Sequence, residues 1–391
     1  MSEHEKFRKS CRTWLEKNCP QDMRTAAKSD EDICWGGRNF RFKNKTQKKW
    51  MERMVAKGWT VPTWPKEYGG GGLSKAEAKI LDQEMRRIKA RPALQSFGIW
   101  MLGPALLKFG NDAQKKEHLT KIARGEIRWC QGYSEPGAGS DLAALATKCE
   151  DKGDHFLVNG QKVWTSYADK SDWIFCLVRT DPKASKHNGI SFVLFDMESP
   201  GVEARPIKLI SGKSPFCETF FENVKVRKDN LIGELNKGWT IAKYLLTHER
   251  EMIGALGRDT RPTSEIIAGT LGLENGKLAD PMLRAKVAEV EIDEWAFKMT
   301  MGRKLAEAKA GASLGADSSM LKYYGTELNK RRFELMMDGA GHEGLEWQGE
   351  NSNDGELARG WLRTKGNSIE GGTSEVQLNI ISKHILKLPN A

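Results

Sequence analysis

The stretch that decides the fold of this chain runs from Gly132 to Ser166 and contains the segments GYSEPGAGSD (132–141) and NGQKVWTS (159–166). In the first segment, glycines and serines make tight turns that expose backbone N–H groups and hydroxyls, so the loop can lie against phosphates or a flat polar ring. In the second, alternation along a strand places Trp164 and Ser166 on one sheet face. An aromatic plane beside a hydroxyl suits a planar heteroaromatic ligand, although a hairpin with a core tryptophan fits the same spacing.

Strand-length runs fill the region from about 126 to 236. They are HFLVNGQKVWTS, DWIFCLVRTD, GISFVLFDM, VEARPIKLI and CETFFENVKV, and Gly, Pro, Asn and Asp turns separate them. Helices do not alternate with these strands, which makes a Rossmann unit a poor match. We therefore predict a β-barrel or sandwich domain inserted between helical parts.

The residues before this region have helical periodicity. We predict helices at 47–57, at 75–87 with Ser74 as N-cap, and at 99–109 as a short buried helix. The breaker-rich segment 61–74 between them is predicted to be an ordered loop.

The residues after the β region are helical again. Asp280 and Pro281 supply an N-cap and a proline at the first helical position. Two apolar stripes at three- and four-residue spacing are interpreted as core or bundle packing, and the polar segment 339–359 as a long loop. The stripes are Ala285, Ala288, Ile292, Trp295 and Met299, and Leu321, Tyr324, Leu328 and Leu335.

Composition limits the class of protein. The 391 residues carry a net charge of +10 with the basic residues dispersed, which indicates a solvated basic surface or attraction for a polyanionic ligand. The seven cysteines are scattered without CxxC spacing, which favours reduced thiols and argues against a zinc site, so we expect no metal. There is no membrane-spanning apolar run and no recognisable targeting segment, so a cytoplasmic location is expected.

A carboxylate interrupts an apolar helix face early in the C-terminal part. Glu249 shares its face with Ala242, Leu245, Met252, Ile253 and Leu256 at helical spacing. Such a carboxylate is costly unless it is paired or faces a cleft, where burial raises its pKa into the range of a general base. An interfacial ion pair with a Lys or Arg explains the same pattern.

The final helix starts within GGTSEVQ (371–377). Ser374 with Gln377 fits a capping box, with Thr373 as the alternative N-cap. The N–H groups and partial positive charge of such a helix end can hold a ligand oxygen. The helix is expected to be apolar along Leu378, Ile381, Ile385 and Leu388.

SEPGAGSD and NGQKVWTS together resemble the flavin-binding signature of the acyl-CoA dehydrogenase family, and the resemblance extends from about Trp59 to Leu388. It implies FAD as cofactor, an acyl-CoA thioester as substrate, and α,β-dehydrogenation of that thioester as in fatty acid β-oxidation. It also implies a multidomain α+β fold with an N-terminal helical domain (1–125), a middle β domain (126–236) and a C-terminal four-helix bundle (237–391).

The resemblance assigns roles to individual residues. Glu249 would be the base and Gly371 would offer a backbone N–H to the thioester carbonyl, with Gly372 beside the substrate. Ser140 would meet the CoA chain and Arg250 its adenine end. The residues implied for FAD are Gln131, Tyr133, Ser134, Ser140, Trp164, Thr165, Ser166, Thr373 and Glu375.

The base departs from the pattern of most family members, which carry it in a YEGT motif near the C-terminus. Aligning Gly372 and Thr373 with the Gly-Thr of that motif places Gly371 where the base usually stands. A second branch of the family carries its Glu before an Arg on the helix after the β domain, and Thr247-His248-Glu249-Arg250 is similar to it. Glu249 is therefore the predicted base, and Glu370, one residue out of register, is the alternative.

Two segments typical of the family are missing. LGLENGKLADP (271–281) stands where an Arg-Lys-Thr-Phe-Gly segment would bind FAD across a subunit contact, and MMDGAGHEG (336–344) replaces a Gln before two glycines. The resemblance implies a homo-oligomer, a dimer or tetramer, but these departures allow a partner chain to complete the FAD site. An electron-transfer flavoprotein is the implied electron acceptor. An oxidase-like flavoprotein and a non-catalytic member that binds DNA or a partner are the alternatives.

Overall fold

The computed structural model describes the whole chain except residues 1, 28, 254–260, 310–314, 350–351 and 390–391, and except the side chains of 247–253, 305 and 308–309. Contacts divide it into two compact units. The first consists of residues 1–207 and 215–245, and the second of residues 208–214 and 246–391. The domain boundaries at 125 and 236 stay predictions.

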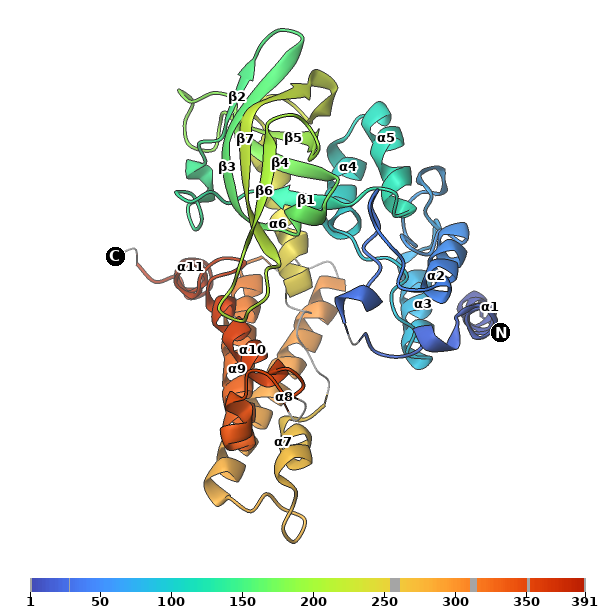
Figure 1. Cartoon of the computed structure of the whole chain (residues 1–391), viewed down its shortest axis with the longest axis vertical. Coiled ribbons are helices and arrows are strands. Elements are labelled where there is room, and N and C mark those ends of the chain that lie inside the picture. The colour runs from blue at the N-terminus through green and yellow to red at the C-terminus, as the bar shows by residue number, and fades with distance from the viewer. Residues whose placement is uncertain (1, 28, 254–260, 310–314, 350–351, 390–391) are drawn as a thin grey trace. The chain divides into compact units, whose positions relative to one another are not determined.

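The first unit begins with five α-helices (Figure 1). They are α1 (Glu3–Asn18), α2 (Lys45–Ala56), α3 (Lys75–Arg87), α4 (Gly103–Phe109) and α5 (Asp112–Ala123). The predicted helix at 75–87 is confirmed, because Ser74 and Glu77 form a reciprocal capping box at its start. The predicted helix at 99–109 is a π-helical turn, Gly98–Leu102, that runs directly into α4.

Eight strands of the first unit form one sheet. They are β1 (Trp129–Gly132), β2 (Lys148–Asp151), β3 (His155–Ser166), β4 (Trp173–Arg179), β5 (Ile190–Asp196), β6 (Val202–Ile207), β7 (Phe216–Arg227) and β8 (Leu231–Ile232). The order is β6-β7-β3-β2-β4-β5-β8, with β1 pairing parallel to β4. All five predicted strands are present, and β3 matches its predicted run residue for residue.

The core of the sheet lies around β4 and β5. Residues 174–178 of β4 are all buried, as expected of a strand covered on both faces. The helix α5 packs against the starts of β1 and β4, where the ring of His118 lies 5.3 Å from Trp129 and 5.2 Å from Trp173, centroid to centroid. Burial holds the pKa of His118 down to about 4, so this histidine is neutral at physiological pH.

The second unit is helical. Its elements are α7 (Thr263–Leu271), α8 (Pro281–Lys309), α9 (Asp317–Ala340), α10 (Glu356–Thr364) and α11 (Ser374–Ile380), and α6 (Gly238–Ile253) leads into it from the first unit. Helices α7, α8, α10 and α11 all contact α9. The predicted start of α8 is confirmed, since Asp280 Oδ1 accepts from the backbone N–H groups of Met282 and Leu283 at 2.8 and 3.2 Å. The three-part order of helices, sheet and helices is thus confirmed.

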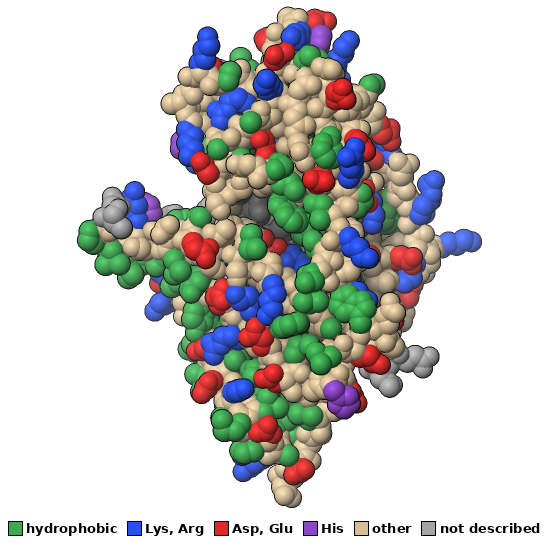
Figure 2. Space-filling view, turned by 60° about the vertical axis from the view of Figure 1, so that its left-hand side comes forward, with side chains coloured by type: hydrophobic (Ala, Val, Ile, Leu, Met, Phe, Trp, Pro, Cys, Tyr) green, Lys and Arg blue, Asp and Glu red, His purple; other side chains and the backbone are tan. Residues whose placement is uncertain are grey.

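The first apolar stripe of α8 was assigned to the wrong environment. Within this chain, Ile292, Trp295 and Met299 are 68, 64 and 71% exposed, and Ala285 and Ala288 are exposed with them. The buried face consists instead of Leu283, Val287 and Val290, which pack with Leu328 and Leu335 of α9. Periodicity could not separate the faces, because α8 carries apolar residues on both. Figure 2 shows hydrophobic side chains exposed on the lower part of the molecule.

Other C-terminal predictions need correction too. The predicted loop 339–359 includes the end of α9 and the start of α10, which was missed. Leu378 and Leu388 of the last apolar stripe are 44 and 53% exposed. In the described part of the chain, no helix is both long and apolar enough to cross a bilayer.

The helices α1 and α3 are joined through one buried carboxylate. Glu84 is 1% exposed and accepts from Arg8 at 3.0 Å, Arg12 at 2.9 Å and Arg87 at 2.8 Å. The hydrogen bond from Arg12 is the largest influence, and together these guanidinium groups hold the pKa of Glu84 down to about 2.

This depressed pKa predicts an acid-dependent loss of stability. Because the pKa of Glu84 is lower in the folded state, its contribution is complete above the unfolded value near 4.5 and is lost as the pH falls toward about 2. Glu84→Gln should lower the free energy of unfolding at neutral pH by about 1–3 kcal/mol. The gap to the wild type should close between pH 4.5 and 2 in denaturation series.

Asp82→Asn is the matched control, since Asp82 is half-exposed and pairs only with the exposed Arg86 on the same helix. It should change stability little at any pH. A Glu84→Gln protein that kept a constant difference from the wild type down to pH 2 would contradict the assignment.

Candidate active site

The Gly-rich loop begins where β1 ends. Gly132 is closely packed there, because a Cβ at this position would lie 2.7 Å from Cδ1 of Ile174 and 3.0 Å from Sγ of Cys176, and these side chains would have to shift. A tight turn follows, in which Glu135 and Ala138 exchange two backbone hydrogen bonds of 3.1 and 3.0 Å around Pro136 and Gly137. Among the residues that the structure describes, no atom lies within 4 Å of a Cβ built on Gly137 or Gly139, so the tip of the loop presents its backbone outward.

A buried ion pair anchors this loop to β3. Lys162 is 0% exposed, and its Nζ donates to Glu135 Oε1 at 2.7 Å and to the Tyr133 carbonyl at 3.1 Å. The same carboxylate accepts from the backbone N–H groups of Ala146 at 2.6 Å and Thr147 at 2.9 Å, and from the Thr147 hydroxyl at 2.6 Å. The Glu135 carboxylate therefore joins Lys162 of β3 to the far end of the loop at Ala146 and Thr147.

The electrostatics of the pair favour the charged carboxylate. Burial by itself would raise the pKa of Glu135, but the charge of Lys162 and the hydrogen bonds from Thr147 and Ala146 outweigh it. The pKa of Glu135 therefore lies below its ordinary value, and the carboxylate is ionised at neutral pH.

Trp164 stands on a bulge that alternation alone does not predict. Between Lys162 and Thr165 the register of β3 against β7 shifts, and Trp164 adopts a left-handed φ of +59°. Such a conformation is costly for a bulky residue and is concentrated at functional sites. It leaves the indole 54% exposed, with the ring of Phe216 edge-on at 5.9 Å.

The loop and the bulge lie next to each other. The backbone N–H of Val163 donates to the Ser134 carbonyl at 2.9 Å, which places Ser134 beside Trp164. Ser166 is half-buried at the end of β3, while Thr165 is fully buried beneath the bulge. In the described part of the chain, the Thr165 hydroxyl has no hydrogen-bond partner.

The remaining residues predicted from this stretch lie in different environments. Gln131 is half-buried within β1, and Ser140 is exposed beyond the turn. The ring of Tyr133 is buried against Phe175 and Phe192, at 6.2 and 6.4 Å between centroids. A ligand at Tyr133 would therefore meet its backbone.

The second predicted constellation belongs to the start of α11. Thr373 is the N-cap, since its Oγ1 accepts from the Val376 N–H at 3.2 Å, so the alternative cap is confirmed and the choice of Ser374 is wrong. The Ser374 hydroxyl instead donates to Glu327 at 3.2 Å. Gly371 and Gly372 have φ of +66° and +93°, and the Gly371 carbonyl accepts from Gln377 Nε2 at 3.1 Å.

The two candidate bases differ in what the structure shows of them. Glu370 is held by Arg363 at 2.6 Å and by the amide of Asn367 at 2.6 Å. The predicted base Glu249 and its neighbour Arg250 stand on α6, but their side chains lie outside the described part of the chain. Glu375 is exposed in the first turn of α11.

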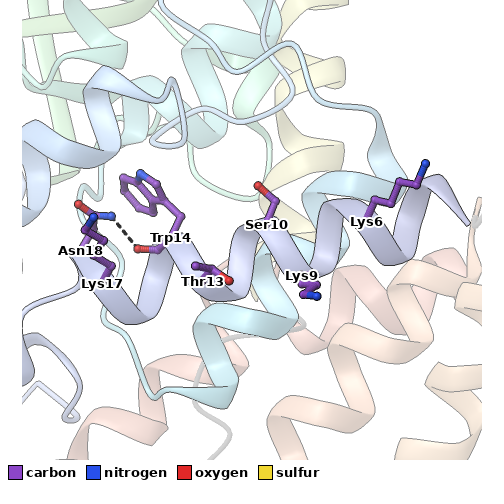
Figure 3. A pocket seen from close by; sticks show the side chains of 7 residues that line it. All are labelled: Lys6, Lys9, Ser10, Thr13, Trp14, Lys17 and Asn18. Atoms are coloured by element: carbon purple, nitrogen blue, oxygen red, sulfur yellow. Dashed lines mark hydrogen bonds between the residues drawn. The ribbon is translucent and has the colours of Figure 1, made fainter. Parts of the chain in front are cut away.

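A separate surface groove follows α1. It is lined by residues of that one helix, which are Lys6, Lys9, Ser10, Thr13, Trp14, Lys17 and Asn18 (Figure 3). The hydrogen bond drawn within it joins the Asn18 amide to the Trp14 carbonyl at 2.8 Å. Because the groove is open and draws on a single helix face, it does not compete with the loop and bulge as a cofactor site.

The sequence reasoning missed the groups that hold the site together. Lys162 and Phe216 belong to strands that were predicted, but no local signal pairs Lys162 with Glu135, which lies 27 residues earlier in the sequence. The sequence offered one sign of this pair, which is that Lys162 stands inside a run predicted to be a strand.

Comparisons with known proteins identify the class. The N-terminal, middle and C-terminal domain models of acyl-CoA dehydrogenase match residues 1–126, 130–224 and 236–386. The acyl-CoA dehydrogenase IpdE1 of Mycobacterium tuberculosis is 34% identical over 100% of this chain and 99% of its own. The chain belongs to the acyl-CoA dehydrogenase family.

Solved structures agree with this. The steroid acyl-CoA dehydrogenase Tcur3481-Tcur3483 has a TM-score of 0.79 at 29% identity, covering 99% of this chain and 98% of that one. The ChsE4-ChsE5 complex from Mycobacterium tuberculosis has a TM-score of 0.75 at 29% identity, covering 100% and 99%. This chain is accordingly an oxidoreductase that uses FAD, and the strained, exposed Trp164 beside Ser134 fits the face of a flat ring.

The buried ion pair predicts a specific pattern of stability. Lys162→Met should lower the free energy of unfolding by about 3–5 kcal/mol, because it leaves the Glu135 carboxylate buried without its cation. Adding Glu135→Gln to this variant should restore part of the loss, since the buried charge is then gone. Urea denaturation of the FAD-loaded protein measures both values.

Lys186→Met removes an exposed partner of Asp141 in the same loop and should cost less than about 1 kcal/mol. If Lys162→Met cost no more than this control, Lys162 would not anchor the loop.

Proposed function

We propose that this chain dehydrogenates an acyl-CoA thioester between its α and β carbons, with Glu249 as the base that takes the α-proton. The observation that carries the choice of base is the environment of the C-terminal motif. Gly371 has no side chain to offer where most of the family carry the base, and Glu370 is engaged by Arg363 and Asn367. On α6, position 249 follows the buried Ala242 by seven residues and Leu245 by four, which is one face of the helix.

The other residues are assigned to binding. Trp164 and Ser134 would lie along the flavin ring, with Gln131, Tyr133, Thr165, Ser166, Thr373 and Glu375 as further FAD contacts. When bound, FAD supplies the acceptor for the hydride that leaves the β carbon. The backbone N–H of Gly371 would donate to the thioester carbonyl, which gains negative charge as the proton leaves. Gly372 and Ser140 would hold the CoA thioester, with Arg250 at the adenine end.

The acyl group is proposed to be bulky. One similar structure is described as a steroid acyl-CoA dehydrogenase, and it matches nearly the full length of this chain. We propose an acyl-CoA with a bulky acyl group of this class as the substrate. We propose an electron-transfer flavoprotein as the electron acceptor.

Rapid mixing with an acyl-CoA tests the base. Anaerobic bleaching of the flavin should be at least about a thousandfold slower in Glu249→Gln, because an amide cannot accept the α-proton. Glu370→Gln is the matched control and should stay within about threefold of the wild type, since Glu370 serves Arg363.

If bleaching were slow in Glu370→Gln and fast in Glu249→Gln, Glu370 would be the base. Bleaching that is equally fast in both would exclude each carboxylate as the base. Fast reoxidation of the bleached flavin by air would point to an oxidase instead.

A second subunit of the same fold is proposed to cover the exposed face of α8. Ile292, Trp295 and Met299 are exposed and recur at three- and four-residue spacing, so they form an apolar face along that helix. Two similar solved structures are described by pairs of names, and one of them is described as a complex. Such a subunit would also complete the FAD site, for which residues 271–281 lack the usual basic segment.

Light scattering on the purified protein tests this assembly. Trp295→Glu combined with Met299→Glu should reduce the molar mass from that of an oligomer to that of a smaller species, because it places charges in an apolar contact. Leu345→Glu, an equally exposed leucine on another element of the second unit, should leave the mass unchanged. An unchanged mass in the α8 variant would exclude this face as the contact.

A further inference from the structure

An arginine without a hydrogen-bonded partner lies at the start of β1. Arg128 is 7% exposed, and its guanidinium stands over the rings of Trp35 and Tyr167, at 4.8 and 5.2 Å from their centroids. In the described part of the chain, no hydrogen bond or ion pair is formed by its side chain. The nearby Asp172 carboxylate accepts instead from the backbone N–H groups of Arg128 at 2.7 Å and Arg38 at 3.0 Å.

Stacking on aromatic rings does not satisfy a buried guanidinium. The rings attract the cation, but its five N–H groups need acceptors that a ring does not provide. Burial lowers the pKa of Arg128 from its ordinary value, which indicates that the charge is poorly solvated where it stands. Arginine remains charged nevertheless, and although the charges of Asp169 and Asp172 act on it, its free N–H groups can bind an anionic group of a ligand.

Further aromatic rings extend this surface. Trp35 lies 6.0 Å from Phe97 and 6.1 Å from Trp100, and these two lie 5.9 Å apart. All four rings are only partly buried, so the cluster is open to a ligand. Trp100 belongs to the π-helical turn, a feature found disproportionately at functional sites.

The cluster is continuous with the flavin-binding stretch. Tyr167 follows Ser166 directly and, like Trp164, has a left-handed backbone, with φ of +54°. Arg128 precedes Gln131 by three residues of one extended segment, a distance of roughly 10 Å at the rise of a strand. A substrate that reacts at the flavin can therefore reach Arg128 with the far end of its acyl group.

We propose that Arg128 binds a carboxylate at the far end of the acyl group, while Trp35, Tyr167, Phe97 and Trp100 contact the apolar body between that carboxylate and the thioester. This specificity rests on the proposed dehydrogenation. A guanidinium can hold a carboxylate through two parallel hydrogen bonds, and the surrounding rings exclude water that would weaken them. The enzyme therefore prefers acyl-CoAs that carry a second, terminal carboxylate.

Matched pairs of substrates test the proposal. Adipoyl-CoA is compared with hexanoyl-CoA, and suberyl-CoA with octanoyl-CoA, in flavin bleaching by the holoenzyme. The wild type should favour the carboxylated member of at least one pair by about tenfold in kcat/KM. Arg128→Gln should lose that preference and stay within about twofold of the wild type on the neutral member, while Arg128→Lys should restore part of it. Equal rates within both pairs, or a uniform loss on all substrates, would overturn the proposal.

Isothermal titration calorimetry of acyl-CoA binding tests the role of Arg128 independently of the proposed dehydrogenation. If no acyl-CoA bleaches the flavin, the dehydrogenation proposal fails, but the dissociation constants of the same pairs still decide the role of Arg128.

Thermal denaturation tests whether Arg128 has a structural role instead. Removing an unpartnered buried charge should leave Tm unchanged or raise it. A fall in Tm of Arg128→Gln, combined with an unchanged preference of this variant for the carboxylated substrates, would make Arg128 a structural residue and overturn the proposal.

Discussion

The ion pair between Lys162 and Glu135 is the contact on which the candidate site depends. An ammonium group without any exposure is tolerable only with acceptors close by, and here the Glu135 carboxylate and the Tyr133 carbonyl accept two of its three N–H groups. Buried pairs of this kind contribute little net stability, because desolvation offsets the attraction between the charges. What this pair provides is a fixed position for the loop that presents Ser134 toward the bulged Trp164.

Elements with a strong local signal could be predicted from the sequence. The strand β3 and the helix α3 have the predicted ends, because turn residues bound the first and a capping box starts the second. The strands β1, β2 and β8 have four residues or fewer and show no alternation to detect. The α8 stripe was misplaced for a different reason. Periodicity reports that a face is apolar but not which surface covers it.

The candidate site was predictable as a motif but not as a three-dimensional arrangement. Spacing pointed to the loop and to Trp164, yet the bulge that turns the indole outward depends on the register between β3 and β7. Contacts between individual side chains were also hidden. Glu370 pairs with Arg363, seven residues earlier, and periodicity gives no sign of this contact. The rings around Arg128 come from three separate stretches of chain.

The left-handed backbone at Gly371 bears on the proposed location of the base at Glu249. A carboxylate-bearing residue there would stand at φ of +66°, at a cost of roughly 1–2 kcal/mol before any contact is considered. A single codon change at Gly371 would therefore place a carboxylate there only together with this backbone strain. A change in the backbone of the segment that removed the left-handed φ would remove that cost, so the conformation of two glycines influences which carboxylate the fold can accept at this place.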